Sequence, residues 1–94
     1  MNLIQHYING KIVTGDSKRK GKVFNPATGA QESEVILGTK SDLDKAVENA
    51  NKAFLSWSAK PAIQRARIIF KYKELIEKNS DEITKLIVSE HGKV

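Results

Sequence analysis

The spacing of apolar residues changes near Ser41, and this change constrains the fold more than any other feature of the sequence. Before Ser41, short apolar stretches are separated by turn-forming residues, a pattern typical of β-strands. After it, apolar residues recur every three or four positions, which is typical of amphipathic helices. The sequence therefore predicts an α/β chain, with an N-terminal β-hairpin and further strands followed by three amphipathic helices.

The strand-forming part begins with a predicted hairpin. Residues 6–8 and 11–13 flank Asn9-Gly10, a pair that favours a two-residue type I′ turn because both positions accept positive φ. Residues 15–22 are polar and basic, so we expect a loop there.

A second pair of strands is predicted to follow that loop. Val23-Phe24 begins an extended stretch that ends in the turn formers of residues 25–29, where Pro26 fixes φ. Residues 33–37 are the expected partner strand, and Gly38 closes the β-rich part.

The first helix is predicted to begin at Ser41. Asp44, three residues later, completes a capping-box-like start in which Asp replaces the usual Glu. The apolar stripe of this helix comprises Leu43, Ala46, Val47, Ala50, Ala53, Phe54 and Trp57. We expect Trp57, at the end of the stripe, to anchor a core or an interface.

Two further helices are predicted. Pro61 suits the first turn of the second helix, where its missing N–H would be unpaired in any case. Asn79 with Glu82 starts the third helix, and Gly92 is placed to end it in the left-handed conformation. The side chains that these helices are expected to bury are Ile63, Ala66, Ile69, Phe70, Tyr72 and Ile76 in the second, and Ile83, Leu86 and Ile87 in the third.

One segment superficially resembles a phosphate-binding loop. It runs from Gly15 through Gly21 to Lys22, but it has one residue too many between its glycines, and Val23 stands where Ser or Thr should bind magnesium. No helix is predicted after it. We therefore interpret this segment as a solvated connection between strands.

Other candidate side chains also have simple structural explanations. The basic cluster Lys18, Arg19, Lys20 and Lys22 could contact nucleic-acid phosphates, but no aromatic residue within it offers a base-stacking platform. Nothing in the sequence brings His6 and His91 together, so we expect neither a metal site nor acid–base chemistry from them. The acidic side chains near the start of the first helix complement its dipole, and they are Asp42, Asp44 and Glu48.

The composition excludes several classes of function. The chain has no cysteine, which excludes disulfides, Cys-ligated zinc or iron–sulfur sites, and any thiolate mechanism based on its own residues. No apolar run approaches the roughly 20 residues of a membrane helix, and residues 1–7 lack the features of a signal peptide. We therefore expect a soluble, cytoplasmic chain with no membrane partner.

Several short blocks follow one another in a specific order. They are Tyr7-Ile8-Asn9-Gly10-Lys11, Asn25-Pro26-Ala27-Thr28-Gly29, Ala53-Phe54 with Trp57, Arg65 and Ile68 ahead of Leu75, Asp81-Glu82, and Glu90-His91-Gly92-Lys93. Each block alone is weak evidence, but their order and spacing closely resemble the N-terminus of the aldehyde dehydrogenase superfamily. The opening block and the ending Ser89-Glu90-His91-Gly92-Lys93 are most similar to its CoA-acylating branch, methylmalonate-semialdehyde dehydrogenase.

The resemblance implies an aldehyde dehydrogenase-like α/β fold and an oxidoreductase activity for a complete, homo-oligomeric member. A cysteine thiolate would attack the semialdehyde, hydride would pass to NAD, and CoA would carry off the acyl group after loss of carbon dioxide. Residues 6–37 would form a peripheral β segment, and residues 41–94 a helical segment of an incomplete dinucleotide-binding domain. The chain lacks the catalytic cysteine and the nucleotide-binding strands, so we expect no catalytic, cofactor-binding or metal-ligating residue in it and no binding of NAD or CoA to it alone.

Two interpretations stay open. In the first, the chain is the leading portion of such an enzyme, inactive alone, and its apolar helix faces belong against the missing remainder. Self-association or docking on that remainder would then be expected. In the second, the chain is a small basic interaction module (net charge +5) that binds full-length subunits or nucleic acid, and strongly salt-dependent DNA binding would favour it.

Overall fold

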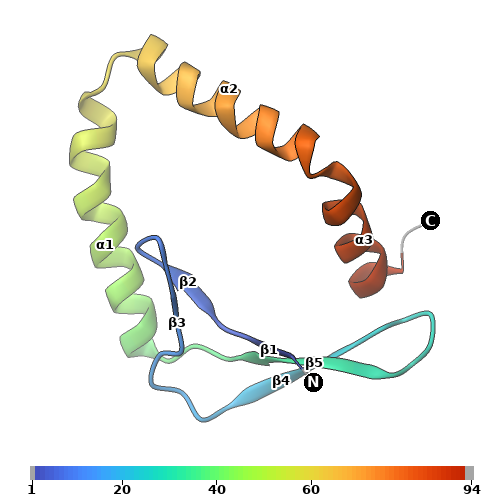
Figure 1. The fold of residues 1–94 in the computed structure, drawn as a ribbon. Helices are drawn as coiled ribbons and strands as arrows, with labels where there is room; N and C mark the ends of the chain where they lie inside the picture. The colour runs from blue at the N-terminus through green and yellow to red at the C-terminus, as the bar shows by residue number, and fades with distance from the viewer. Residues whose placement is uncertain (1, 93–94) are drawn as a thin grey trace.

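The computed structural model describes residues 2–92 and places strands first and helices after them (Figure 1). Residues 93 and 94, the end of the predicted helical segment 41–94, lie outside the described residues. The strands are β1 (Asn2–Ile4), β2 (His6–Ile8), β3 (Lys11–Val13), β4 (Lys20–Phe24) and β5 (Gln31–Ile36). The helices are α1 (Lys40–Ala59), α2 (Ala62–Lys78) and α3 (Ser80–His91). This order confirms the change from strands to helices that the apolar spacing predicts.

One sheet has the strand order β1-β5-β4. β4 and β5 pair in antiparallel fashion, as predicted, with an irregular register between Val23 and Phe24. The predicted loop over residues 15–22 is wrong at its end, because Lys20 already pairs with Ile36 in this ladder. The predicted span of 33–37 for the partner strand is also shifted, since β5 covers residues 31–36. β1 runs parallel to β5 and is not predicted by the sequence analysis.

β2 and β3 form a separate two-stranded hairpin. Ile8 pairs with Lys11 across a two-residue turn. Asn9 has φ 55° and Gly10 has φ 71°, and positive φ at both positions is the requirement of a type I′ turn. The predicted hairpin is confirmed.

The turn between β4 and β5 is also confirmed. The backbone N–H of Asn25 donates to the Ala30 carbonyl at 2.9 Å, and the N–H of Gly29 donates to the Asn25 carbonyl at 2.8 Å. The Asn25 side chain accepts from the Ala27 N–H at 2.9 Å. Asparagine at the first position of a turn typically makes this bond.

The predicted cap of the first helix is wrong by two residues. The N-cap of α1 is Thr39, and Ser41 already lies inside the helix. The Thr39 hydroxyl accepts from the Asp42 N–H at 3.2 Å, while the Asp42 carboxylate accepts from the Thr39 N–H at 3.0 Å. These reciprocal bonds form a capping box. Asp44 instead pairs with Lys40 at 2.7 Å.

The boundaries of α2 and α3 agree with the sequence analysis more closely. Pro61 is the N-cap of α2, one residue before the predicted first turn. Asn79 occupies the N-cap position of α3, but its side chain makes no capping hydrogen bond there. Its side-chain amide donates instead to the Leu75 carbonyl of α2 at 2.8 Å. Gly92 ends α3 with φ 74°, as predicted.

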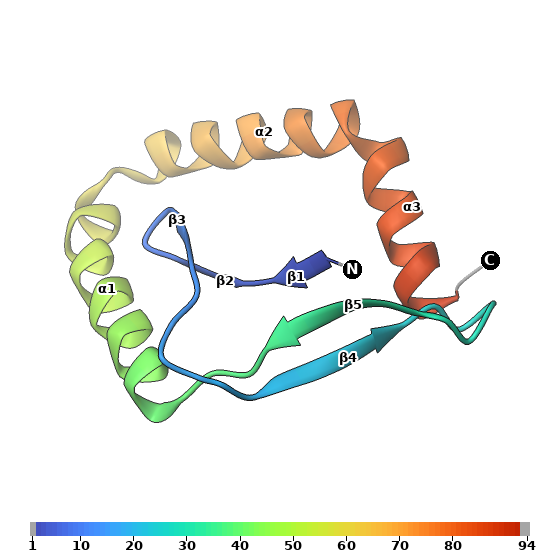
Figure 2. The same ribbon diagram turned by 60° about the horizontal axis from the view of Figure 1, so that its bottom comes forward.

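The helices and the sheet form an open frame. α1, α2 and α3 follow one another around its edge, and the β4–β5 side closes it (Figures 1 and 2). The end of α3 returns to the β4–β5 turn, where the Cβ position of Gly92 lies 3.0 Å from Cγ of Pro26. The Cα radius of gyration is 17.0 Å, whereas a compact domain of this length has about 12 Å.

The frame buries very little apolar surface. Among residues 2–92, Ile36 is the one hydrophobic side chain classed as buried, with 4% of its surface exposed. The prediction that the apolar stripe of α2 is buried is wrong for residues 2–92. The frame leaves α2 without a strand or helix alongside it (Figure 2). Ala66 is half-buried, and Phe70 is 62% exposed. Ile83, Leu86 and Ile87 of α3 are exposed as well.

Candidate functional site

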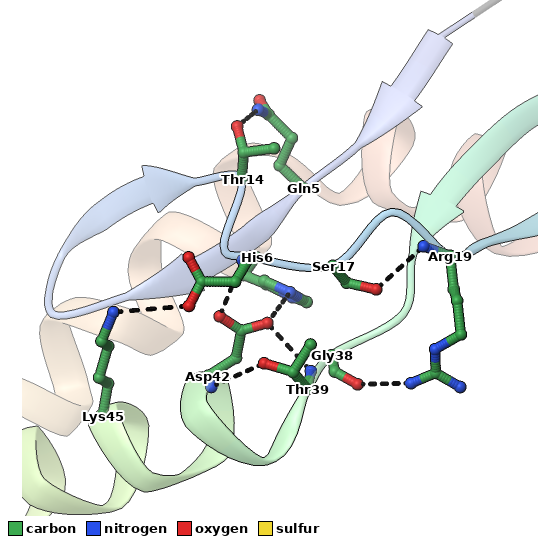
Figure 3. A network of polar contacts seen from close by, with 10 residues as sticks. Gln5, His6, Thr14, Ser17, Arg19, Gly38, Thr39, Asp42 and Lys45 are labelled. Carbon is green, nitrogen blue, oxygen red and sulfur yellow. Dashed lines mark hydrogen bonds and ion pairs between the residues drawn. The ribbon is translucent and has the colours of Figure 1, made fainter.

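The Asp42 side chain lies where separate segments of the chain meet (Figure 3). Only 6% of its surface is exposed. It contacts His6 of β2, the loop at Gly15 and Asp16 that follows β3, and Thr39 at the start of α1. These residues form a polar cluster, which we call the Asp42 cluster.

Both carboxylate oxygens of Asp42 accept a hydrogen bond from the backbone. Oδ1 accepts from the backbone N–H of Asp16 at 3.2 Å, and Oδ2 accepts from the backbone N–H of Thr39 at 3.0 Å. His6 Nε2 lies 3.6 Å from Oδ2. The carboxylate therefore links β2, the β3–β4 loop and the N-terminus of α1.

The pKa of Asp42 is lowered from its ordinary value of 3.8. The backbone N–H of Thr39 is the main cause, because a hydrogen bond to the carboxylate favours its charged form. The Thr39 side chain, the Asp16 N–H and the charge of His6 act in the same direction, and burial opposes them. Asp42 is thus ionised at neutral pH.

The backbone of the β3–β4 loop approaches Asp42 closely at Gly15. A Cβ atom at this position would lie 2.6 Å from Asp42 Oδ1. Gly15 also has φ +73°, a conformation that residues with a side chain rarely adopt. Gly15 therefore allows the loop to reach the carboxylate, and the segment continues into β4 and not into a phosphate-binding helix.

The predicted basic cluster is partly engaged within the fold. Arg19 donates from Nη2 to the Gly38 carbonyl at 2.9 Å. Lys20 lies 3.8 Å from Glu34 on the neighbouring strand. These contacts give Arg19 and Lys20 structural roles, and Glu34 offsets part of the positive charge of Lys20.

The structure brings one predicted candidate, His6, next to another, Asp42, but leaves His91 apart at the exposed end of α3. An Asp beside a His can orient a general base. Here, however, His6 Nε2 lies 3.6 Å from the carboxylate and makes no hydrogen bond to it, and the carboxylate already accepts backbone N–H groups. The arrangement supports an anchor between segments.

The remaining candidates have local partners. Asp44 and Glu48 form exposed i,i+4 ion pairs with Lys40 and Lys52, at 2.7 and 3.3 Å. Trp57 is half-buried near the end of α1. Within residues 2–92 no group of three or more His, Cys, Asp or Glu side chains could hold a metal ion, and no described helix has the length and apolar character needed to cross a membrane.

The anchoring role of Asp42 was not predicted from the sequence. A usable signal was present, because Thr39-x-x-Asp42 has the same capping-box pattern as Ser41-x-x-Asp44 and directly follows Gly38. The contact with Gly15 had no such local signal, since the two residues are distant in the sequence.

The chain is similar to known proteins over nearly its whole length. A family model described as the aldehyde dehydrogenase family matches residues 12–94. A malonate-semialdehyde dehydrogenase of Bacillus pumilus is 40% identical over 93 residues, covering 99% of this chain and 19% of the relative. A malonate-semialdehyde dehydrogenase 2 of Bacillus cereus is 45% identical over 91 residues, covering 97% of this chain and 19% of the relative. The chain thus spans about a fifth of the length of these curated relatives.

Solved structures share the same arrangement of elements. The crystal structure of a putative methylmalonate-semialdehyde dehydrogenase from Sinorhizobium meliloti, complexed with NAD, matches with a TM-score of 0.92 and 38% identity, covering 95% of this chain and 18% of that chain. A methylmalonate-semialdehyde dehydrogenase from Oceanimonas doudoroffii matches with a TM-score of 0.92 and 41% identity, covering 97% of this chain and 18% of that chain. The open frame is therefore found within chains about five times as long.

Proposed function

The chain belongs to the aldehyde dehydrogenase family, and on that basis we propose that it serves as the leading portion of an NAD-dependent, CoA-acylating malonate- or methylmalonate-semialdehyde dehydrogenase. The complete enzyme would convert a semialdehyde, CoA and NAD to an acyl-CoA, carbon dioxide and NADH. The observation that carries the proposal is the match of 95% of this chain to 18% of a related enzyme structure at a TM-score of 0.92.

In this proposal the chain has a structural role. Residues 6–37 form the peripheral β segment, and the helices within residues 41–92 pack beside the dinucleotide-binding domain. The exposed apolar side chains of α1, α2 and α3 support this assignment, because such faces are normally covered in a folded protein. The enzyme would be cytoplasmic and homo-oligomeric.

The chemistry is assigned to residues outside this chain. The family mechanism needs a thiolate, and the chain contains no cysteine. The described residues also do not fit NAD. The segment after Gly15 continues into strand β4. At the start of α1, the Asp42 N–H donates to the Thr39 hydroxyl and the Thr39 N–H donates to the Asp42 carboxylate, whose negative charge would repel a phosphate. We therefore propose that no residue of this chain binds NAD, CoA or a metal.

A hybrid enzyme tests this proposal. The corresponding segment of the Bacillus pumilus relative is replaced by residues 1–94, and CoA-dependent NADH formation from malonate semialdehyde is measured. We expect a soluble, active hybrid, no activity from the 94-residue chain alone, and no activity from the relative without the segment. Turnover by the isolated chain, or a folded hybrid without activity, would contradict the proposal.

A further inference from the structure

The turn of the β2–β3 hairpin exposes an asparagine that is followed by glycine. Asn9 and Gly10 are both exposed, and nothing lies within 4 Å of the Cβ position of Gly10. Because glycine has no side chain, its backbone nitrogen can approach the side chain of the preceding residue without steric hindrance. We propose that Asn9 is a site of spontaneous deamidation and that its conversion loosens the hairpin.

The reaction needs no partner other than water. The Gly10 nitrogen forms a bond to Cγ of Asn9 and loses its proton, and the side-chain amide nitrogen leaves as ammonia. Water then opens the resulting succinimide at either carbonyl carbon. One opening gives aspartate, and the other gives isoaspartate, in which the backbone passes through the former side chain.

The hairpin is weakly held, so its turn can leave the closed conformation and reach the geometry for attack. β2 and β3 form their own two-stranded sheet, which is a marginally stable unit in water. Tyr7 and Ile12 pair directly across the strands, yet they are 74% and 70% exposed. Segments with so little buried surface open locally at low free-energy cost.

The other asparagines of the chain are protected in different ways. Asn25 precedes Pro26, which has no backbone N–H to act as the nucleophile. Asn49 and Asn51 lie inside α1, where the helix fixes the backbone. The Asn79 side chain is held by the Leu75 carbonyl at 2.8 Å. Asn2 lies in β1 before the bulky Leu3.

Isoaspartate adds one atom to the backbone of the turn. The pairing of Ile8 with Lys11 depends on a two-residue turn with positive φ at both positions. The longer backbone no longer matches the geometry of that two-residue turn. Since β2 also carries His6, the modification weakens the contact between β2 and Asp42.

Peptide mapping by mass spectrometry tests the proposal after incubation of the purified hybrid enzyme, which carries residues 1–94, at mildly alkaline pH. We expect Asn9 to convert several-fold faster than any other asparagine of this segment, and backbone amides of residues 6–8 to lose protection from hydrogen exchange as isoaspartate forms. Conversion at Asn9 no faster than at Asn2, Asn49, Asn51 and Asn79 would overturn it, and so would unchanged protection after conversion.

Two variants separate attack by Gly10 from simple opening of the turn. Asn9→Gly keeps a type I′ sequence and is expected to remove the mass gain from this peptide while the hairpin persists. Gly10→Ala hinders the nucleophile but also strains a residue with φ 71°, so it favours opening. We expect slower conversion in Gly10→Ala, and faster conversion would overturn the proposed role of Gly10.

Discussion

The Asp42 carboxylate leaves no room for a side chain at residue 15, since a Cβ atom on Gly15 would lie 2.6 Å from Asp42 Oδ1. This close approach places the N–H of Asp16 within 3.2 Å of the same oxygen. The β3–β4 loop is thereby fixed to the start of α1. The strand part and the helical part of the chain are joined at this point by side-chain contacts as well as by the backbone (Figure 3).

Gly15→Ala should lower the melting temperature of the hybrid enzyme more than Gly29→Ala does. Both glycines have positive φ, +73° and +74°, so either alanine incurs a strain of about 1–2 kcal/mol. Only Gly15 also faces a carboxylate, whereas nothing lies within 4 Å of the Gly29 Cβ position. Thermal denaturation of the two variants provides the comparison. Equal shifts would show that the contact with Asp42 has no energetic role.

Asp42→Asn should destabilise the hybrid enzyme more than Asp44→Asn. The two N–H groups of Asp16 and Thr39 donate to different carboxylate oxygens, and an amide has a single oxygen. Its NH₂ group would therefore face a part-buried N–H donor. Asp44 makes only an exposed ion pair with Lys40, a type of contact that contributes little. Melting temperatures measured at neutral pH test this order, and a larger effect at Asp44 would contradict it.

The lowered pKa of Asp42 predicts a stability loss at acid pH. The carboxylate contributes its full stabilisation above the unfolded-state pKa of 3.8, and the contribution is lost as the pH falls through the lower folded-state value. The difference in melting temperature between the wild-type hybrid and Asp42→Asn should therefore be constant near neutrality and shrink below this pH. A difference in melting temperature that grows on acidification would contradict this prediction.

The exposed apolar side chains of α2 predict self-association of the isolated chain. Replacing Ile69 and Phe70 by Gln should shift the chain towards the monomer in sedimentation, because both side chains are more than half exposed. Lys73→Gln is the matched control, since it removes only an exposed ion pair with Glu77. An equal effect of the control, or a wild-type chain that is monomeric throughout, would disprove the role of this face.

Local signals predicted most of the fold. Asn9-Gly10, residues 25–29 and Gly92 each determine a turn or a helix end through backbone conformations that few residues adopt, and all of them lie where they were predicted. The change of apolar period placed the strands and helices in the right order. These features depend on residues that are close together in the sequence.

Contacts between distant residues were not predictable in the same way. β1 pairs with β5 across the whole β segment, and no turn between them specifies this register. The anchoring role of Asp42 depends on Gly15 and His6, which belong to other segments. The two overlapping capping patterns at Thr39 and Ser41 were equally acceptable locally, and only the loop contact with Asp42 distinguishes them.

The expected burial of the α2 stripe depended on surfaces that residues 2–92 do not provide. The periodicity of Ile69 and Ile76 correctly indicates a helix with an apolar face, but it does not say which surface covers that face. The frame leaves the apolar face of α2 exposed, which agrees with the match of this chain to about a fifth of a longer relative.

Differential scanning calorimetry of the 94-residue chain, combined with its molecular mass in solution, tests the central claim most directly. We expect an associating chain without a sharp transition, because an open frame with one buried hydrophobic residue among residues 2–92 lacks a cooperative core. A monomer that unfolds in a single sharp endotherm, with the enthalpy of about 0.7 kcal/mol per residue that globular domains show, would contradict it.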